Sequence, residues 1–432
     1  SFSGTQVVPV KHTAFAHENN YLNPLVAVTS GNRTWTEVAD YIMSRSFGDS
    51  EPEDDLPPQL AQIIAGSEDR IRRLETAFYW IRDKLKYASL KSAHEHIGTS
   101  QRAARIVESG TADCKDRAYL MWLVCRELKY PCQYVFVSSR NGLVIRELPA
   151  DQFDHVFVRV KTDKDWLYLD PTSTESAFDT TPFWCQGLYA LVLDGSGRLE
   201  RIPEDPPDRN VLAFHESIEE IRDGWLEGGF DIVARGHIGR SLNELWKSLS
   251  LAVDDPQRAA TESLRRYLPT SVATTYERIS DTGSSTVFHI SGHMRRCRLQ
   301  SMRGGELVGS LSWSLPFLPV SFWRVLSLDR HFVFNFPCKI KLAVTFGPKV
   351  TSRLTDFSRV TPHECDIGLV SERVESRKDL LTVVRNIQIN RRFITGDLTA
   401  GLPLMLDRVE SALRLAVSLS GVADAESAAA EN

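Results

Sequence analysis

Cys114, His155 and Asp170 are the residues of this 432-residue sequence whose types and positions could do chemistry together. A thiol can attack a carbonyl carbon, an imidazole can take up and return the proton, and a carboxylate can orient the imidazole. Cys114 follows the turn Ser109-Gly110-Thr111-Ala112 and stands at the start of a predicted helix. A helix N-terminus presents positive charge and unpaired N–H groups, which favour a thiolate and can hold an oxyanion.

His155 and Asp170 lie on two neighbouring strand-like segments, Phe153–Val160 and Trp166–Asp170. The polar residues between the segments are few enough for a hairpin. If the last residue of the first segment pairs with Asp165, His155 lies directly opposite Asp170, with Cβ atoms about 5 Å apart. The pattern therefore predicts an imidazole held by a carboxylate at a strand end.

Other interpretations of these residues are open from the pattern alone. Cys114 could be a small apolar filler at a helix start, and His155 with Asp170 could be a surface ion pair. The three could also bind a metal, although three mixed ligands without a fourth make a poor structural site. His94 and His96 are two residues apart in an apparent loop, which is either an ordinary polar loop or a metal site. We predict no metal.

The elements that must position these residues lie between residues 58 and 201. Ser67–Tyr87 has apolar residues at helical spacing on one face, and Thr99–Ser109 is a shorter helix candidate. Asp113–Lys129 is apolar nearly all round, which is typical of a buried helix. Strand candidates follow, beginning with Cys132–Ser138. Helices first and an antiparallel sheet second predict an α+β domain.

Two polar connectors with three prolines each, at residues 48–58 and 202–210, divide the rest of the chain. The segments they predict are 1–47, the remnant of an N-terminal β-rich domain; 58–201, the core; 211–420, a C-terminal β-rich domain; and 421–432, a flexible tail. In the first segment, Val7–Val10 and Leu25–Val28 are strand candidates and Trp35–Ser44 is a helix candidate.

The C-terminal segment is interpreted as β-sandwich-like, with an appended helix at Pro403–Leu419 and another helix at Asp255–Tyr267. Its strand candidates are Phe230–Ile238, Val272–Ile279, Ser285–His293, Ser310–Leu315, Phe332–Pro337 and Cys338–Phe346. No residue of this segment indicates chemistry.

The composition excludes several classes of protein. There are 51 Lys and Arg against 56 Asp and Glu, a net charge of −5, and no basic block, so nucleic acid is not expected as a partner. No apolar stretch reaches the length of a membrane span. Seven scattered cysteines do not indicate a disulfide framework. The chain begins at Ser1 with no signal-like segment, which leaves two locations open: periplasmic or secreted if a leader is removed, and otherwise cytoplasmic.

Three blocks of this sequence resemble the transglutaminase-like superfamily, in the family's order and spacing. They are Gly110–Ala118 around Cys114, Phe153–Val156 around His155, and Trp166–Thr172 around Asp170. The Cys-Lys-Asp form is similar to bacterial proteins whose core lies between two β-rich domains of unknown function. The resemblance implies a papain-like α+β core with Cys114 as nucleophile, His155 as general base and acid, and Asp170 as the residue that orients His155.

The chemistry that the resemblance implies is acyl transfer on a carboxamide or peptide bond through a thioester. The acyl group would pass to an amine acceptor, as in a transglutaminase, or to water, as in an amidase or protease. The expected substrate is a peptide or protein, and no cofactor is needed. A catalytically silent binding or scaffolding protein with the same fold is the alternative.

Several neighbours of the expected site have two possible roles. Tyr87 is an oxyanion donor candidate or a packing residue. Asp113 and Asp116 are expected to be helix N-terminal charges that face solvent, although as flanking anions they would oppose a thiolate. The aromatic residues of the two strands could line an acyl-binding groove, but core packing is the expected role. These residues are Phe157, Trp166 and Tyr168.

Overall fold

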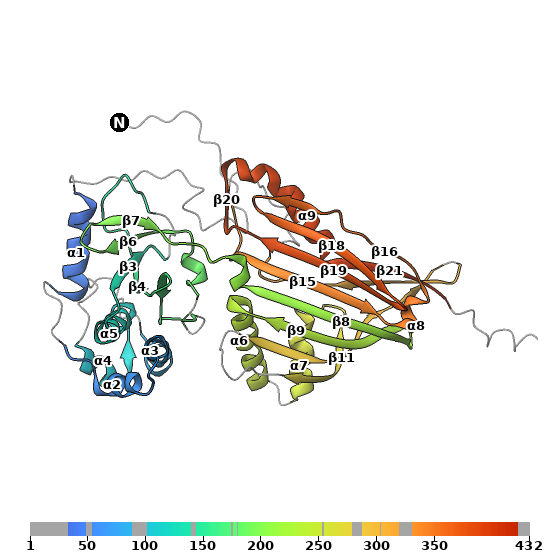
Figure 1. The fold of residues 1–432 in the computed structure, drawn as a ribbon, viewed down its shortest axis with the longest axis horizontal. Coiled ribbons are helices and arrows are strands. Elements are labelled where there is room, and N and C mark those ends of the chain that lie inside the picture. The colour runs from blue at the N-terminus through green and yellow to red at the C-terminus, as the bar shows by residue number, and fades with distance from the viewer. Residues whose placement is uncertain are drawn as a thin grey trace, which may run out of the picture. The chain divides into compact units, whose positions relative to one another are not determined.

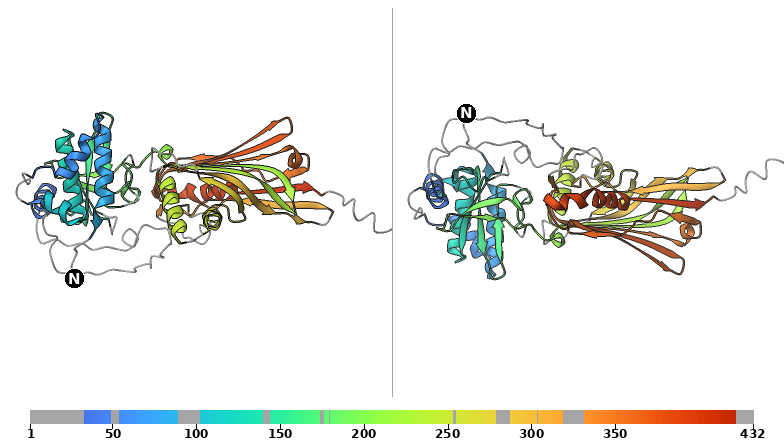
Figure 2. Two further views of the ribbon diagram at one scale, coloured as in Figure 1. Left: turned by 90° about the horizontal axis from the view of Figure 1, so that it is seen from below. Right: turned by 90° about the horizontal axis from the view of Figure 1, so that it is seen from above.

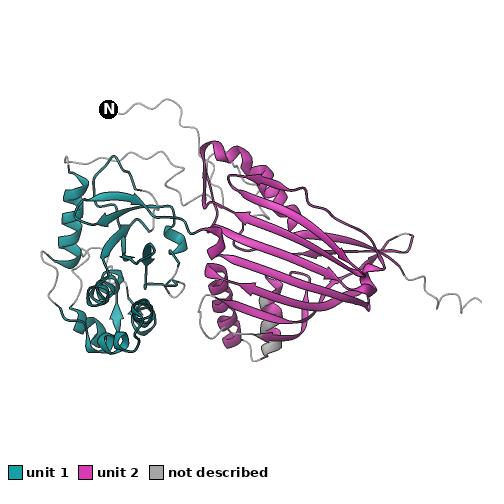
Figure 3. Ribbon diagram, in the orientation of Figure 1, with its two compact units in different colours: residues 1–12, 16–205 teal, residues 13–15, 206–432 magenta. Residues whose placement is uncertain are grey.

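The computed structural model describes residues 33–48, 54–88, 102–139, 144–173, 176–178, 180–252, 255–278, 287–302, 304–318 and 331–421. The chain divides into two compact units, and the boundary between Asp205 and Pro206 lies inside the predicted connector 202–210 (Figure 3). Unit 1 holds the described residues up to 205, and unit 2 holds those from 206 onward. The strand candidates 7–10 and 25–28, His94 and His96, and the tail 422–432 lie outside the described residues.

The helices of unit 1 precede its sheet, as the sequence predicted (Figure 1). They are α1 (Trp35–Phe47), α2 (Pro58–Ala65), α3 (Arg70–Lys84), α4 (Ala103–Ser109) and α5 (Cys114–Glu127). Two short parallel strands, β1 (Lys86–Tyr87) and β2 (Thr111–Ala112), link the end of α3 to the start of α5. Helix α5 is central, because eleven of its fourteen residues are buried.

Residues 33–47, assigned from the sequence to a separate β-rich domain, lie in unit 1. They form helix α1, whose buried residues belong to the same apolar core as those of α3 and α5. The ring of Phe47 stacks on Tyr134 with centroids 4.1 Å apart. This helix therefore helps to stabilise the core that carries the predicted site.

The sheet of unit 1 is antiparallel and has the strand order β5-β4-β3-β6-β7. Its strands are β3 (Cys132–Val137), β4 (His155–Lys161), β5 (Trp166–Leu169), β6 (Tyr189–Leu193) and β7 (Arg198–Arg201). The sequence did not predict β6 or β7. Unit 1 is thus a mixed helix-and-sheet unit in which α5 contacts both β3 and β4.

The predicted hairpin register is wrong by two residues. Val160 pairs with Leu167 instead of Asp165, and Lys161 pairs with Trp166. The reason is the turn, where Thr162 donates to the carbonyl oxygen of Asp165 from its N–H (3.0 Å) and its hydroxyl (2.8 Å). Lys161 therefore stays in the ladder and the whole turn lies one residue further along the chain.

Unit 2 is built on an eight-stranded sheet with the order β10-β11-β9-β8-β15-β19-β18-β17. Its strands are β8 (Val211–Arg222), β9 (Trp225–Ala234), β10 (Val272–Arg278), β11 (Phe288–Arg298), β15 (Cys338–Phe346), β17 (His363–Cys365), β18 (Gly368–Arg377) and β19 (Leu380–Ile389). Strands β8 and β15 pair in parallel, and the other neighbours are antiparallel. The predicted strands overlap β9, β10, β11 and β15.

A second sheet of four strands has the order β12-β13-β21-β16, and β14 pairs with β20. Figure 2 shows the strands of unit 2 from two further sides. These strands are β12 (Gln300–Ser301), β13 (Glu306–Ser312), β14 (His331–Val333), β16 (Leu354–Phe357), β20 (Phe393–Thr395) and β21 (Arg414–Ser420). The helices are α6 (Gly236–Ala252), α7 (Pro256–Arg265), α8 (Pro348–Thr351) and α9 (Leu402–Ala412). The assignment of a β-sandwich-like domain stays a prediction.

The predicted helix Pro403–Leu419 is wrong in its second half. Helix α9 ends at Ala412, and β21 pairs with β13 from Arg414 onward. In this part Leu415, Val417 and Leu419 are buried and alternate with more exposed residues. That period of two fits a half-buried strand better than a helix.

No helix in the described part of the chain combines the length and the apolar character that crossing a membrane requires.

Candidate active site

Cys114 is the first residue of helix α5, and the residue before it caps the helix. The carboxylate of Asp113 accepts hydrogen bonds from the N–H groups of Lys115 (2.8 Å) and Asp116 (3.1 Å). Gly110 has a φ of +64°, which lets the chain turn from α4 into β2 before the cap. Cys114 is 5 % exposed. The local sequence thus places a nearly buried thiol at the positive end of a buried helix.

The two acidic neighbours of Cys114, Asp113 and Asp116, take part in the helix cap. The expectation that they face solvent is therefore wrong. Asp116 is buried, and its carboxylate accepts from the N–H of Asp113 (3.1 Å). The ammonium group of Lys115 lies 2.5 Å from the carboxylate of Asp113. Because Lys115 partly neutralises Asp113, the flanking acids oppose a thiolate less than two free carboxylates would.

His155 begins β4, and Asp170 follows directly after β5. His155 Nε2 lies 3.1 Å from Asp170 Oδ2. The other carboxylate oxygen accepts from the N–H (3.0 Å) and the hydroxyl (2.7 Å) of Thr172. Asp170 is 1 % exposed, so these neighbours replace its hydration. The carboxylate is fixed in place on both of its oxygens.

The charges of this pair stabilise each other. Burial disfavours the Asp170 anion, but the charge of His155 and the hydrogen bonds from His155 and Thr172 outweigh it and lower the pKa of Asp170. Burial likewise disfavours a charged His155, but the charge of Asp170 and hydrogen bonds with Asp170 and Cys114 raise the pKa of His155 to about 10. The imidazole is therefore held in its protonated form at neutral pH.

Cys114 lies close enough to His155 to contribute to the raised pKa of the imidazole. Asp170 occupies Nε2, which leaves Nδ1 as the ring nitrogen that can hydrogen-bond the thiol. The three predicted residues thus form one chain of interacting groups, from sulfur to imidazole to carboxylate. A protonated imidazole next to a thiol favours the thiolate, which is the reactive form.

Tyr87 also lies at this site. It pairs with Ala112 through the short β1–β2 ladder, two residues before Cys114. Cys114 lies close enough to Tyr87 to contribute to the raised pKa of its hydroxyl. Partial burial, and then the negative charges of Cys114, Asp113 and Asp170, raise the pKa of Tyr87 well above its usual value. The phenol therefore stays protonated and can donate a hydrogen bond.

A comparison with protein-family models decides what kind of core this is. Residues 58–171 match the transglutaminase-like superfamily. The match includes Tyr87, Cys114, His155 and Asp170 and supports the general type of a cysteine-dependent peptidase or transferase. No curated protein matches the sequence.

Solved structures add a similarity of fold. A "putative protease" from Parabacteroides distasonis has a TM-score of 0.54 at 11 % identity, over 89 % of this chain and 59 % of that chain. This chain therefore spans less than two thirds of that protein. A "putative cysteine protease" from Cytophaga hutchinsonii has a TM-score of 0.20 at 17 % identity, over 26 % of this chain and 35 % of that one.

Trp184 lies beside the candidate site, and the sequence did not indicate it. It lies in the 3₁₀ turn Phe183–Cys185, and its ring contacts His155 edge-on with centroids 5.3 Å apart. It also contacts the ring of Phe157 at 6.3 Å. Trp184 belongs to no periodic segment, so the aromatic pair Phe183-Trp184 after Pro182 was the only available signal.

The strand aromatics expected to be core residues have that role in part. Phe157 and Tyr168 are buried, and their rings contact each other with centroids 6.5 Å apart. Trp166 is half-buried, and the guanidinium of Arg159 lies over its ring at 4.3 Å. Phe157 also lies 6.1 Å from the ring of His155, so it supports the imidazole from within the core.

Arg117 is the second residue that the sequence did not indicate. It is 2 % exposed, and its guanidinium donates to the carbonyl oxygens of Pro171 and Leu85, and to that of Arg82 at 3.3 Å. Burial lowers the pKa of Arg117. One side chain of α5 thus ties the chain beside Asp170 and the chain leading to Tyr87 to the helix that carries Cys114.

Among the described residues, no group of three or more His, Cys, Asp or Glu side chains is arranged to hold a metal ion.

Proposed function

We propose that Cys114, His155 and Asp170 form the catalytic triad of a thiol enzyme that transfers acyl groups from a carboxamide or peptide bond. The observation that carries the proposal is the His155–Asp170 contact at 3.1 Å, together with the raised pKa of His155, to which Cys114 contributes. Cys114 would be the nucleophile, His155 the general base and acid, and Asp170 the residue that orients and charges the imidazole.

The first half of the reaction forms a thioester. The thiolate of Cys114 attacks the carbonyl carbon, and the carbonyl oxygen becomes an oxyanion. His155 then gives its proton to the leaving nitrogen, the C–N bond breaks, and an amine or ammonia departs. In the second half, water or an acceptor amine attacks the thioester, His155 takes the proton of the attacking group, and the thiol leaves as a thiolate held by the imidazolium.

The oxyanion requires hydrogen-bond donors near Cys114. The N–H groups of Lys115 and Asp116 are occupied by the carboxylate of Asp113, so the helix N-terminus offers fewer free donors than the sequence indicated. We therefore include the Tyr87 hydroxyl in the proposal, together with the N–H of Cys114. The raised pKa of Tyr87 keeps this hydroxyl protonated.

The proposed substrate is a peptide or protein. The chain with the similar fold from Parabacteroides distasonis is named a protease, and peptide substrates come into this proposal partly from that name. The aromatic ring of Trp184 beside His155 would give an acyl chain an apolar surface. The acceptor is water or an amine, and no cofactor takes part in either route.

The test compares the full chain with its Cys114→Ala variant on peptide substrates and on glutamine donors, with and without a primary amine. Release of ammonia or peptide fragments would identify a hydrolase, and incorporation of the amine would identify a transferase. We expect the variant to fold and to lose all turnover. Turnover that survives in the variant would refute the triad.

Alkylation by iodoacetamide separates the enzyme from a silent scaffold. We expect Cys114 to react faster than the other six cysteines at neutral pH, because it lies close to an imidazole whose pKa is raised to about 10. Slow labelling of all the cysteines at similar rates would instead indicate a binding or scaffolding protein.

A further inference from the structure

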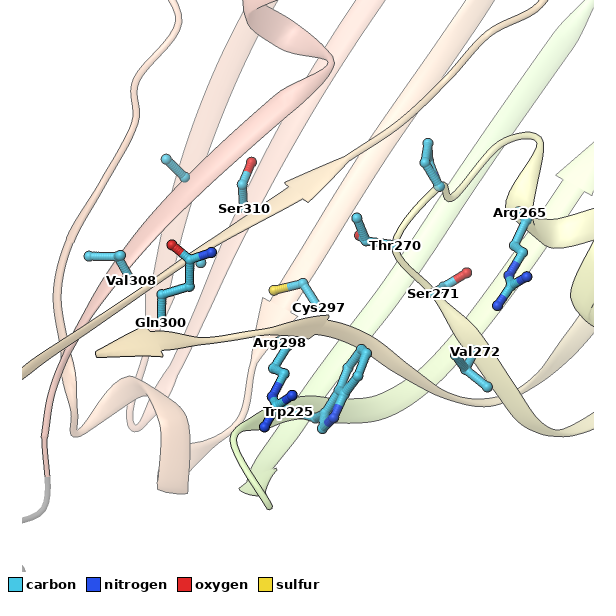
Figure 4. Close-up of a pocket in the computed structure, with 13 residues that line it drawn as sticks. Trp225, Arg265, Thr270, Ser271, Val272, Cys297, Arg298, Gln300, Val308 and Ser310 are labelled. Atoms are coloured by element: carbon cyan, nitrogen blue, oxygen red, sulfur yellow. The ribbon is translucent and has the colours of Figure 1, made fainter. Parts of the chain in front are cut away.

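Unit 2 contains a cleft of about 800 Å³ that is independent of the thiol site (Figure 4). It lies where the chain leaves the eight-stranded sheet at the end of β11 and enters the four-stranded sheet at β12. Trp225 and Arg298 line it from the first sheet, and Gln300 and Ser310 line it from the second. The volume is in the range of small-molecule sites, about 300–1,000 Å³.

The charged residues that line the cleft all have the same sign. They are Arg265 and Arg298, and none of the described lining residues is acidic. Arg265 makes a surface ion pair with Glu262 at 3.5 Å, in which both side chains are half exposed. Arg298 has no ion pair with any residue in the described part of the chain. Two guanidinium groups in a lining that holds no carboxylate favour an anionic ligand.

The wall of the cleft at Thr270 is held by a buried ion pair. Arg296 is fully buried and bonds Glu216 through Nε at 2.7 Å. Its Nη1 donates to the hydroxyl oxygen of Thr270 at 3.1 Å. Because this oxygen accepts from Arg296, the hydroxyl proton of Thr270 is free to donate to a ligand. Thr270 is thus fixed as a third donor of the cleft.

Most of the lining surface of the cleft is apolar, and a glycine keeps the cleft open. Trp225 lies beside Arg298, and Val272 and Val308 face the same space (Figure 4). At Gly309 a Cβ atom would come within 3.1 Å of the Cys297 sulfur, and even closer to a neighbouring leucine. A side chain at Gly309 would therefore crowd the floor of the cleft.

We propose that this cleft binds a small anionic ligand. Its carboxylate or phosphate group is held by Arg265, Arg298 and the Thr270 hydroxyl, and its aromatic or other apolar part lies against Trp225. The site makes no use of Cys114 chemistry, so it stands or falls separately from the proposed enzyme.

The test titrates the full chain with each probe and monitors binding by ligand-observed NMR. The probes are benzoate and phenyl phosphate, which combine a ring with an anion, inorganic phosphate, which lacks the ring, and benzamide, which lacks the charge. We expect saturable binding of at least one ring anion and at least tenfold weaker binding of benzamide. Whichever of benzoate and phenyl phosphate binds more tightly identifies the anion. No saturable binding of either, or equal binding of benzamide, would overturn the proposal.

Variants locate the binding in this cleft. Arg298→Gln should weaken the ring anion at least tenfold. Arg295→Gln is the matched control, because Arg295 lies on the same strand, pairs with Glu227 at 2.7 Å and does not line the cleft. Trp225→Leu should weaken the ring anions but leave inorganic phosphate unchanged. Equal effects of the two arginine variants would show that binding responds only to net charge, and the proposal would fail.

Discussion

Replacing Asp170 with Asn tests the electrostatics of the proposed triad with little change of shape. The oxygen of an asparagine can still accept the two hydrogen bonds that Thr172 gives to Asp170 Oδ1. The group facing His155 becomes neutral, however, and only the smaller contribution of Cys114 then opposes the burial that disfavours a charged imidazole. The perturbation therefore acts on the charge of His155 and leaves the packing of the strand end in place.

The size of the effect follows from the pKa of His155. With a pKa of about 10, the imidazole is protonated in about 99 % or more of molecules at pH 7.5. In the variant the pKa should fall to the ordinary 6.5 or below, which leaves at most about one tenth protonated at that pH. Since the imidazolium stabilises the thiolate, alkylation of Cys114 near neutral pH should slow about tenfold or more.

The assay is the rate of iodoacetamide alkylation at Cys114 between pH 5.5 and 9.5, followed by mass spectrometry of the Cys114 peptide. We expect the wild-type thiol to react rapidly down to acidic pH and the variant to react only as the pH approaches the ordinary range of a free thiol, about 8.5. Asp163→Asn is the control, because it removes one carboxylate from the exposed turn of the same hairpin. Superimposable profiles for Asp170→Asn and wild type would refute the reasoning.

Three further predictions concern the same site. Tyr87→Phe should lower kcat by about tenfold to a thousandfold with little change in thermal stability, and an unchanged kcat would remove the phenol from the oxyanion site. Arg117→Met should lower the free energy of unfolding, measured by urea titration, by about 2–4 kcal/mol, because it leaves buried carbonyl oxygens without donors. The control is Arg105→Met on the exposed face of α4, which should change this free energy by less than about 0.5 kcal/mol. Because the pKa of His155 is raised, the contribution of the imidazolium to folding stability is complete below about pH 6.5 and is lost as the pH rises toward 10. Between pH 6.5 and 10, the urea midpoint of the wild type should therefore fall more steeply than that of His155→Gln.

The sequence predicted α1, α3, α4 and α5 because their burial follows regular patterns, but it did not predict α2. Helix α5 is apolar nearly all round, and the structure buries it on all sides. Unit 2 was harder, and β8 shows why. Its inward-facing series is Leu212, Phe214, Glu216 and Ile218, in which a carboxylate interrupts the apolar alternation. Glu216 can be buried because Arg296 from β11 pairs with it and Trp313 donates to its other oxygen, and no local pattern can indicate those partners.

The same limit applies to the residues around the proposed triad. Trp184 reaches His155 from a 3₁₀ turn, and Arg117 joins two segments that are 32 and 54 residues away from it along the chain. Neither position belongs to a periodic apolar series with an expected direction. Contacts of this kind depend on how loops and helices pack, which single-sequence patterns do not determine.

The contact between His155 and Asp170 is predictable for a different reason. The alternation of side chains along a strand fixes the face of the sheet on which each residue lies, even when its partner on the neighbouring strand is predicted wrongly. The observed ladder places Asp170 two residues before the position opposite His155, so the two side chains meet on a diagonal. A displacement by one residue would have turned one of them to the other face, whereas a displacement by two leaves both on the same face. Diagonal neighbours lie within reach of long side chains, and Pro171 ends the strand there, which leaves Asp170 free to turn toward the imidazole. Alternation along the strands therefore carries the prediction, and the exact length of the turn does not.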